Sequence, residues 1–190
     1  MSGDAGAGQA AVKAAVRPDV LARARGVRLL ILDVDGVLTD GSLYFTARGE
    51  EMKCFDVRDG HGLRMLSDAG VAAAIVSGRR SDAVLRRAEG LGITEVMQGI
   101  DDKLAACRSL AERCGLALSA CAAMGDDLPD LPVLRHAGLA VAVPAAPAIV
   151  RAAAHYITEH QGGRGAVREL CEFILTAQGR MEGALARYLA

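Results

Sequence analysis

Short apolar runs bounded by turn residues recur along this chain, and the first of them precedes two acids. Val27–Val34 (VRLLILDV) carries six apolar or β-branched side chains, interrupted only by Arg28 and Asp33. A run of this length predicts a strand buried on both faces. Asp33 and Asp35 follow directly, and a core tolerates carboxylates only when they are paired or bind a metal. We therefore expect the strand to end at Asp33, with both acids in the crevice beyond its carboxyl end.

Strand-like runs and helical patterns alternate through the rest of the chain. Strands are predicted at residues 71–76, 94–97, 120–124, 139–143 and 155–158, and helices at residues 18–24, 59–68, 81–91, 101–114, 129–136, 148–154 and 166–177. Asp59 is the predicted N-cap of the second of these helices. Alternation of this kind predicts a parallel sheet between layers of helices. The predicted fold class is α/β, a three-layer Rossmann-like parallel sheet with a β-hairpin flap and no large cap domain.

The hairpin is predicted within about residues 41–56, where two short β-prone runs flank a glycine-containing turn. Coming directly after the acids, it can act as a flap over the site or as an edge that pairs with another subunit. Residues 1–17 are rich in alanine and glycine, which predicts a flexible tail. No break in composition divides the remainder, so residues 18–190 are predicted to form a single domain.

Composition and charge exclude several classes of function. A net charge of −1 and an aromatic content of 3% are unlike a nucleic-acid-binding surface. No uncharged apolar stretch approaches ~18 residues and no signal peptide is recognisable, so we expect a cytoplasmic protein without a membrane partner. Cys107, Cys114 and Cys121 recur every seven residues, a spacing that also fits a metal or redox device. With no CxxC among the five cysteines, we interpret them as small core residues.

Polar groups follow three of the predicted strands, and a parallel sheet gathers such groups at one edge. They are Asp33 and Asp35, Ser77 and Arg79, and Asp126 and Asp127, with Lys103 near the start of the helix after a fourth strand. Taken singly, each has an ordinary structural interpretation as a helix cap or a solvated side chain. Their common position at strand ends favours a functional site instead.

This set of groups suits phosphoryl transfer. Clustered carboxylates repel one another unless a hard cation joins them, and Mg²⁺ binds few carboxylates together with water and phosphate oxygens. A hydroxyl, the N–H groups of a helix start and a lysine can hold the remaining phosphate oxygens. An ionised aspartate can act as the nucleophile and form an aspartyl-phosphate. A second acid can protonate the leaving alcohol and then deprotonate water.

These residues also carry a family resemblance. The motifs resemble the four motifs of the haloacid dehalogenase superfamily, in order: Asp33-Val-Asp-Gly-Val-Leu-Thr-Asp, Ser77-Gly-Arg, Lys103 and Gly125-Asp-Asp-Leu-Pro-Asp. The segments VRDGHGL, MGDDLPDLPVL and GGRGAVREL make the chain similar to one branch, the 3-deoxy-D-manno-octulosonate 8-phosphate phosphatase family, over about residues 29–179. The resemblance implies a Mg²⁺-dependent phosphatase of this sugar-acid phosphate, acting through an aspartyl-phosphate in lipopolysaccharide sugar biosynthesis.

The resemblance also implies a role for each motif residue. Asp33 is the expected nucleophile and a metal ligand, and Asp35 the acid/base and a ligand through its carbonyl. Asp126 is expected to bind the metal, and Asp127 to orient Lys103 or a metal-bound water. The phosphoryl group and the sugar acid are expected to bind to Ser77, Gly78, Lys103, Thr39, Arg79, Arg58 and Arg164.

Among the arginines, Arg164 is flanked by glycines in a loop and is the favoured partner of the sugar-acid carboxylate. Arg168 is weighed equally as a substrate ligand and as a surface ion pair. Capless relatives form tetramers in which the hairpin, here about residues 43–55, builds intersubunit contacts, so the resemblance implies a homotetramer.

Three alternatives remain open at this point. The same chemistry could act on a nine-carbon sugar-acid 9-phosphate, because selectivity lies in a few hairpin and loop side chains. A phospho-receiver domain would also combine a phosphorylated aspartate with a lysine in an α/β fold. A non-catalytic assembly domain derived from this fold is the third alternative.

Overall fold

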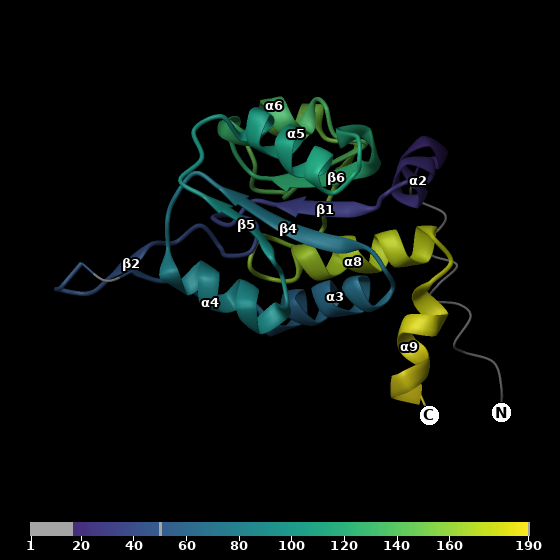
Figure 1. Cartoon of the computed structure of the whole chain (residues 1–190), viewed down its shortest axis with the longest axis horizontal. Coiled ribbons are helices and arrows are strands. Elements are labelled where there is room, and N and C mark those ends of the chain that lie inside the picture. Colours follow the sequence, from purple (N-terminus) through teal and green to yellow (C-terminus); the bar gives the residue numbers. More distant parts are fainter. Residues whose placement is uncertain (1–16, 50, 190) are drawn as a thin grey trace.

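The computed structural model describes residues 17–49 and 51–189. The predicted flexible tail therefore lies outside the described residues, except for Arg17. Within them, a six-stranded parallel sheet has the order β5-β4-β1-β6-β7-β8, and β2 and β3 form a separate antiparallel pair (Figure 1).

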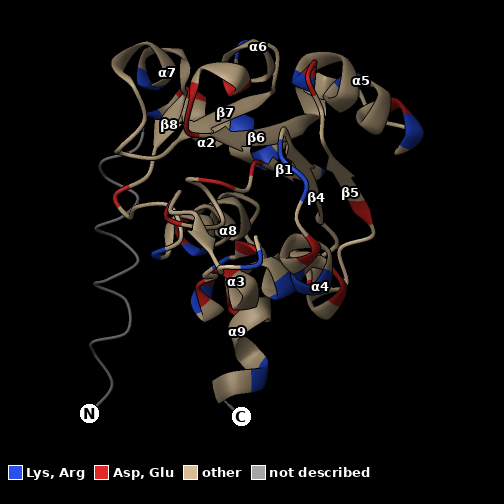
Figure 2. Ribbon diagram, turned by 90° about the vertical axis from the view of Figure 1, so that its left-hand side faces the viewer, with Lys and Arg blue, Asp and Glu red and all other residues tan. Residues whose placement is uncertain are grey.

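The strands of the main sheet lie close to where the hydrophobic pattern predicts them. Their bounds are β1 (Leu29–Leu32), β4 (Ala72–Ser77), β5 (Glu95–Gln98), β6 (Cys121–Gly125), β7 (Leu139–Ala142) and β8 (Tyr156–Ile157). The helices are α2 (Pro18–Arg25), α3 (Val57–Asp68), α4 (Asp82–Leu91), α5 (Lys103–Arg113), α6 (Leu131–Leu134), α7 (Ala148–Ala153), α8 (Ala166–Ala177) and α9 (Met181–Leu189). Helices α3, α4 and α8 lie on one side of the sheet and α5, α6 and α7 on the other (Figure 2). The predicted three-layer α/β fold is confirmed.

Strand β1 lies at the centre of the sheet, and all of its side chains are buried. It pairs in parallel with β4 on one side and β6 on the other, so that Leu30 faces Ala73 and Ala122 across the two ladders. Both neighbouring strands carry alanines opposite β1, and their small side chains leave room for the bulky residues of β1 and for the covering helices. This packing fixes the end of β1, from which Asp33 emerges.

The predicted hairpin is present and very short. Strands β2 (Tyr44–Phe45) and β3 (Glu51–Met52) pair in antiparallel fashion, and the hairpin projects from the body of the molecule (Figure 1). Gly49 in its turn has φ +82°, a conformation that glycine adopts without strain.

The prediction that Asp59 caps α3 is wrong. The N-cap is Asp56, whose side chain accepts a hydrogen bond from the Arg58 backbone N–H at 2.7 Å. Asp59 instead lies inside α3, is 1% exposed, and accepts hydrogen bonds from the backbone N–H groups of Gly165 at 3.4 Å and Arg168 at 2.8 Å. Gly165 is the N-cap of α8 and has no side chain to cap it, so Asp59 supplies the cap from another helix.

Two further differences concern helices. The helix predicted at residues 129–136 is divided into a 3₁₀ turn, η2 (Leu128–Asp130), and the short α6. Two prolines explain the division, because each lacks the N–H that would continue a helix. Helix α9 was not predicted, and among its described residues none is buried.

The remote cap predicts a measurable loss of stability. Replacing Asp59 by alanine leaves the N–H groups of Gly165 and Arg168 buried without this acceptor, so the free energy of unfolding should fall by about 1–3 kcal/mol. The change can be read from urea denaturation. Asp68→Ala is the matched control on the same helix, because Asp68 makes an exposed ion pair with Arg187 and should lose about 0.5 kcal/mol or less. Equal losses for the two variants would contradict the capping role of Asp59.

Candidate active site

The loop after β1 brings the first two acids to the carboxyl edge of the sheet. The Asp33 N–H donates to Met124 O at 3.1 Å, which extends the β1–β6 ladder to the loop, and Val34 O then accepts from the N–H groups of residues 37–39. Gly36 has φ +85°, and a Cβ at this position would lie 2.1 Å from Asp126 Oδ2. Glycine is therefore required here, because the loop backbone packs directly against the Asp126 carboxylate.

Asp33 and Asp126 meet in an acidic cluster with Asp130. One carboxylate oxygen from each lies within 4.8 Å of the others. Burial, followed by repulsion from Asp130, raises the pKa of Asp33 to about 6. Burial and repulsion from Asp33 raise the pKa of Asp126 to about 7. Closely spaced carboxylate oxygens are hard donors, so this cluster could hold a divalent cation such as Mg²⁺.

Lys103, at the start of α5, contacts two of these acids. Its side chain is 7% exposed, and Nζ lies 2.9 Å from Asp33 Oδ1 and 2.6 Å from Asp130 Oδ1. Burial disfavours the ammonium charge, but Asp33 and Asp130 outweigh this effect and raise the pKa of Lys103. The lysine therefore stays charged and fixes the orientation of the Asp33 carboxylate.

The acid that contacts Lys103 beside Asp33 is Asp130, whereas the sequence analysis expected Asp127 to orient either Lys103 or a metal-bound water. The Asp127 side chain accepts from the Leu128 N–H at 2.8 Å and begins the 3₁₀ turn η2. Asp130 closes this turn as a capping box, its Oδ2 accepting from the N–H groups of Asp126 and Asp127. A Cβ on Gly125 would lie 2.4 Å from Asp130 Cβ, so glycine makes room for this acid. The Asp-Leu-Pro-Asp spacing of a capping box was the signal available in the sequence.

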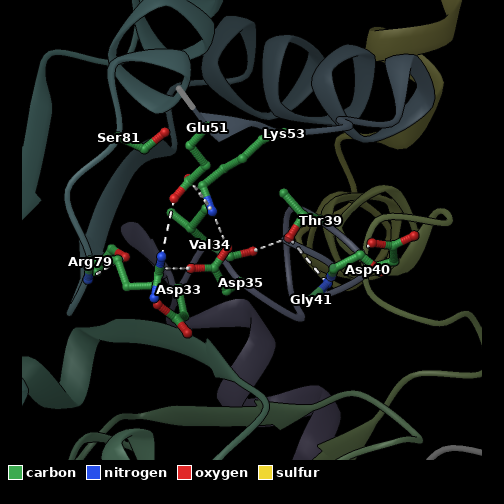
Figure 3. Close-up of polar contacts among 12 residues, drawn as sticks. Asp33, Val34, Asp35, Thr39, Asp40, Gly41, Glu51, Lys53, Arg79 and Ser81 are labelled. Carbon is green, nitrogen blue, oxygen red and sulfur yellow. Dashed lines mark hydrogen bonds and ion pairs between the residues drawn. The ribbon is translucent and has the colours of Figure 1, made fainter. Parts of the chain in front are cut away.

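Asp35 belongs to a second group of charges, which reaches the hairpin (Figure 3). Lys53 Nζ contacts Asp35 Oδ1, and Arg79 Nε lies 3.7 Å from Asp35 Oδ2. Glu51 bridges the same two cations, 2.9 Å from Lys53 Nζ and 3.1 Å from Arg79 Nη2. The sequence analysis singled out neither Glu51 nor Lys53.

A cavity of about 440 Å³ lies between the two groups of charges. Ser77, at the end of β4, is 3% exposed, and its Oγ accepts from the Arg79 N–H at 3.3 Å. The predicted site residues that line the cavity are Asp33, Asp35, Ser77, Gly78, Arg79, Lys103, Asp126 and Asp127. The structure thus brings together at one edge the acids, the hydroxyl and the cations that the sequence placed at separate strand ends.

The other predicted substrate ligands lie outside the lining of this cavity. Thr39 is 1% exposed, and its hydroxyl donates to Val34 O at 3.4 Å and accepts from the Gly41 N–H at 3.2 Å, within the loop itself. Arg58 pairs with Asp56 at 2.7 Å. Arg168 forms an ion pair with Glu172 along α8, which agrees with the second of the two interpretations given for it in the sequence analysis.

Arg164 lies in a glycine-rich loop that supports the loop after β1. Its Nη2 lies 3.3 Å from Asp40 Oδ2. The Gly163 N–H donates to Val37 O at 2.9 Å, and a Cβ on Gly162 would lie 1.7 Å from Gly36 O. These backbone contacts explain the glycines of this motif in structural terms.

Within the described residues, no helix is long and apolar enough to cross a membrane.

The chain is similar to known phosphatases over most of its length. Residues 88–170 match the family model of haloacid dehalogenase-like hydrolases. The chain is 48% identical over 169 residues to the 3-deoxy-D-manno-octulosonate 8-phosphate phosphatase of Yersinia pestis, which covers 89% of this chain and 90% of that protein. It is 46% identical over 180 residues to the protein of the same name from Escherichia coli K12. The aligned region covers 95% of this chain and 96% of that protein.

Solved structures agree with these relatives. The phosphatase of the same name from Moraxella catarrhalis, crystallised with magnesium, phosphate and KDO, matches with a TM-score of 0.88 and 45% identity, covering 90% of this chain and 98% of that chain. The cobalt-bound phosphatase from Haemophilus influenzae matches with a TM-score of 0.81 and 42% identity, covering 84% of this chain and 93% of that chain.

The raised pKa values predict that cation binding depends on pH. The carboxyls of Asp33 and Asp126 have folded-state pKa values of about 6 and about 7, above the ordinary 3.8, so the folded protein holds their protons more tightly than the unfolded chain. Without metal, their contribution to stability is present at acidic pH and is lost as pH rises from about 4 to about 7. A cation needs both groups ionised, so Mg²⁺ affinity should rise through the same range.

Calorimetric titration with Mg²⁺ at pH 5.5 and pH 8 measures this effect, and Mg²⁺ should raise the Tm more at pH 8. Asp126→Asn should remove most of the difference, because one of the two titrating ligands is then always neutral. Equal affinity of the wild-type protein at both pH values would contradict the proposed ligands.

Proposed function

Because this chain belongs to the 3-deoxy-D-manno-octulosonate 8-phosphate phosphatase family of haloacid dehalogenase-like hydrolases, we propose that it converts this sugar-acid phosphate to the free sugar acid and inorganic phosphate with Mg²⁺. Family membership makes it a phosphoric monoester hydrolase. The observation that carries the proposal is the meeting of Asp33, Asp126 and Lys103 in the lining of one cavity, which Asp35 and Arg79 also line.

The residues present fit a magnesium ion. Asp33 and Asp126 would hold it through carboxylate oxygens, and Asp35 through its main-chain carbonyl. Gly36 supports this assignment, because any larger residue would displace the Asp126 carboxylate. Bound Mg²⁺ supplies charge stabilisation for the phosphoryl oxygens.

The reaction follows from the side chains around the cavity. An Asp33 oxygen attacks phosphorus while the bond from phosphorus to the substrate's C8 oxygen breaks, and Asp35 donates a proton to that oxygen. Lys103 and the Ser77 hydroxyl hold the phosphoryl oxygens. Asp35 then accepts a proton from water, which attacks the aspartyl-phosphate and releases phosphate. Asp33 is ready to attack, because Lys103 already orients its carboxylate.

The hairpin is the proposed contact with other copies of the chain in a homotetramer. Four large apolar side chains on it are 40–57% exposed: Leu43, Tyr44, Phe45 and Met52. So many exposed apolar groups on one short element are typical of an interaction surface.

The proposed setting is lipopolysaccharide sugar synthesis in the cytoplasm. All five cysteines are free thiols, in keeping with a reducing compartment.

Loss of the nucleophile tests the reaction. Asp33→Asn should lower phosphate release from 3-deoxy-D-manno-octulosonate 8-phosphate by roughly 10⁴-fold or more, because an amide does not attack phosphorus. A retained melting transition serves as the control for folding. Comparable release by the variant would exclude Asp33 as the nucleophile. On the wild-type enzyme, a higher kcat/KM for a nine-carbon sugar-acid 9-phosphate would reassign the substrate.

Loss of the apolar hairpin surface tests the assembly. The double substitution Tyr44→Ser and Phe45→Ser should lower the molar mass measured by light scattering from that of a tetramer to that of smaller species, because the buried apolar area is lost. Leu85→Ser is the matched control, since Leu85 is 49% exposed and belongs to α4, not to the hairpin. An unchanged mass for the double variant would place the interface elsewhere.

A further inference from the structure

Lys53 follows β3 directly, and its buried ammonium group contacts Asp35, which is the acid/base of the proposed reaction. Its side chain is 1% exposed, and Nζ contacts Asp35 Oδ1 and lies 2.9 Å from Glu51 Oε1 (Figure 3). Lysine is almost never buried to this degree unless its charge is paired. Both of its partners are carboxylates, and one of them lines the cavity.

The four charged groups form a closed ring of alternating sign. Lys53 and Arg79 each contact both Asp35 and Glu51, through different oxygens of each carboxylate. One oxygen of Asp35 is therefore held by the hairpin and the other by the loop after β4. This arrangement fixes the plane of the Asp35 carboxyl group.

Lys53 is the stronger of the two anchors. The Arg79 side chain is 48% exposed, and its Nε lies 3.7 Å from Asp35 Oδ2. Water and salt therefore weaken the attraction between Arg79 and Asp35. Lys53 is nearly inaccessible to water, where an ionic contact is screened much less.

Glu51 holds Lys53 in place. Burial disfavours its charge, but the contacts with Lys53 and Arg79 outweigh this effect and lower the pKa of Glu51. Glu51 lies on β3, so the hairpin carries both the lysine and the acid that aims it.

We propose that Lys53 is a positioning residue that holds Asp35 in the orientation needed to pass its proton to the leaving alcohol. This inference rests on the proposed function, in which Asp35 is the general acid. It gives the hairpin a direct part in the reaction, in addition to its part in assembly.

The leaving group distinguishes this role from a merely structural one. The alkoxide at C8 of the sugar acid is a poor leaving group and needs a proton as it departs, whereas 4-nitrophenolate leaves without one. The value of kcat/KM reports the steps up to departure of the leaving group. The ratio of kcat/KM for the two substrates is also independent of the fraction of active enzyme, so partial unfolding of a variant cancels.

The experiment measures this ratio for the wild-type enzyme, Lys53→Met, Lys53→Arg, Arg48→Met and Asp35→Asn. For Lys53→Met, kcat/KM should fall about 10-fold or more for the sugar-acid phosphate and by much less for 4-nitrophenyl phosphate. Lys53→Arg keeps the charge and should restore part of the loss. Arg48→Met removes an exposed cation in the same hairpin and should leave the ratio unchanged.

The Asp35→Asn variant distinguishes failure of this inference from failure of the proposed function. If Asp35→Asn changes the ratio strongly while Lys53→Met lowers kcat/KM equally for both substrates, Lys53 does not position the acid and the inference is overturned. If Asp35→Asn itself leaves the ratio unchanged, Asp35 is not the general acid, and this part of the proposed function fails together with the inference.

Discussion

Repulsion between carboxylates crowded at one edge of the sheet is the constraint on which this site depends. Oxygens of Asp33, Asp126 and Asp130 lie within 4.8 Å of one another, and Lys103 supplies one positive charge against them. Burial, together with the remaining excess of negative charge, raises the pKa values of Asp33 and Asp126. A divalent cation relieves the same imbalance, so the crowding that makes the metal-free site costly also gives it affinity for metal.

A different charge balance surrounds Asp35. Here two carboxylates face two cations in a ring that is neutral as a whole and needs no metal. The loop after β1 thus contributes an acid to each of two unlike environments. The first contains carboxylates that could hold a metal, and the second holds the carboxyl group of Asp35 in one orientation.

The sequence could predict those features that depend on local pattern. The apolar run before Asp33 and the repeated alternation of strand and helix are enough to place the acids, Ser77 and Lys103 at one edge of a parallel sheet. Pairing between distant acids and bases could not be predicted in this way. Asp59 was predicted to cap α3 from its position before a helical pattern, but its contact with the backbone of α8 buries it, and that contact cannot be read from the local sequence.

The same limit explains why Asp130 and Lys53 were missed. Asp130 reaches Lys103 because a 3₁₀ turn folds it back, and a helix had been expected there. The burial of Lys53 depends on how the hairpin lies over the loop after β1, which a two-residue ladder does not specify.

The contact between Gly36 and Gly162 bears on the order in which the protein is made. The loop after β1, which carries Asp33 and Asp35, is supported by backbone from residues 162–163, which lie far from it in the sequence. During synthesis the amino-terminal part leaves the ribosome first, at about 5–20 residues per second. A nascent chain therefore carries Asp33 and Asp35 without the support that shapes their loop until residues 162–163 have also left the ribosome.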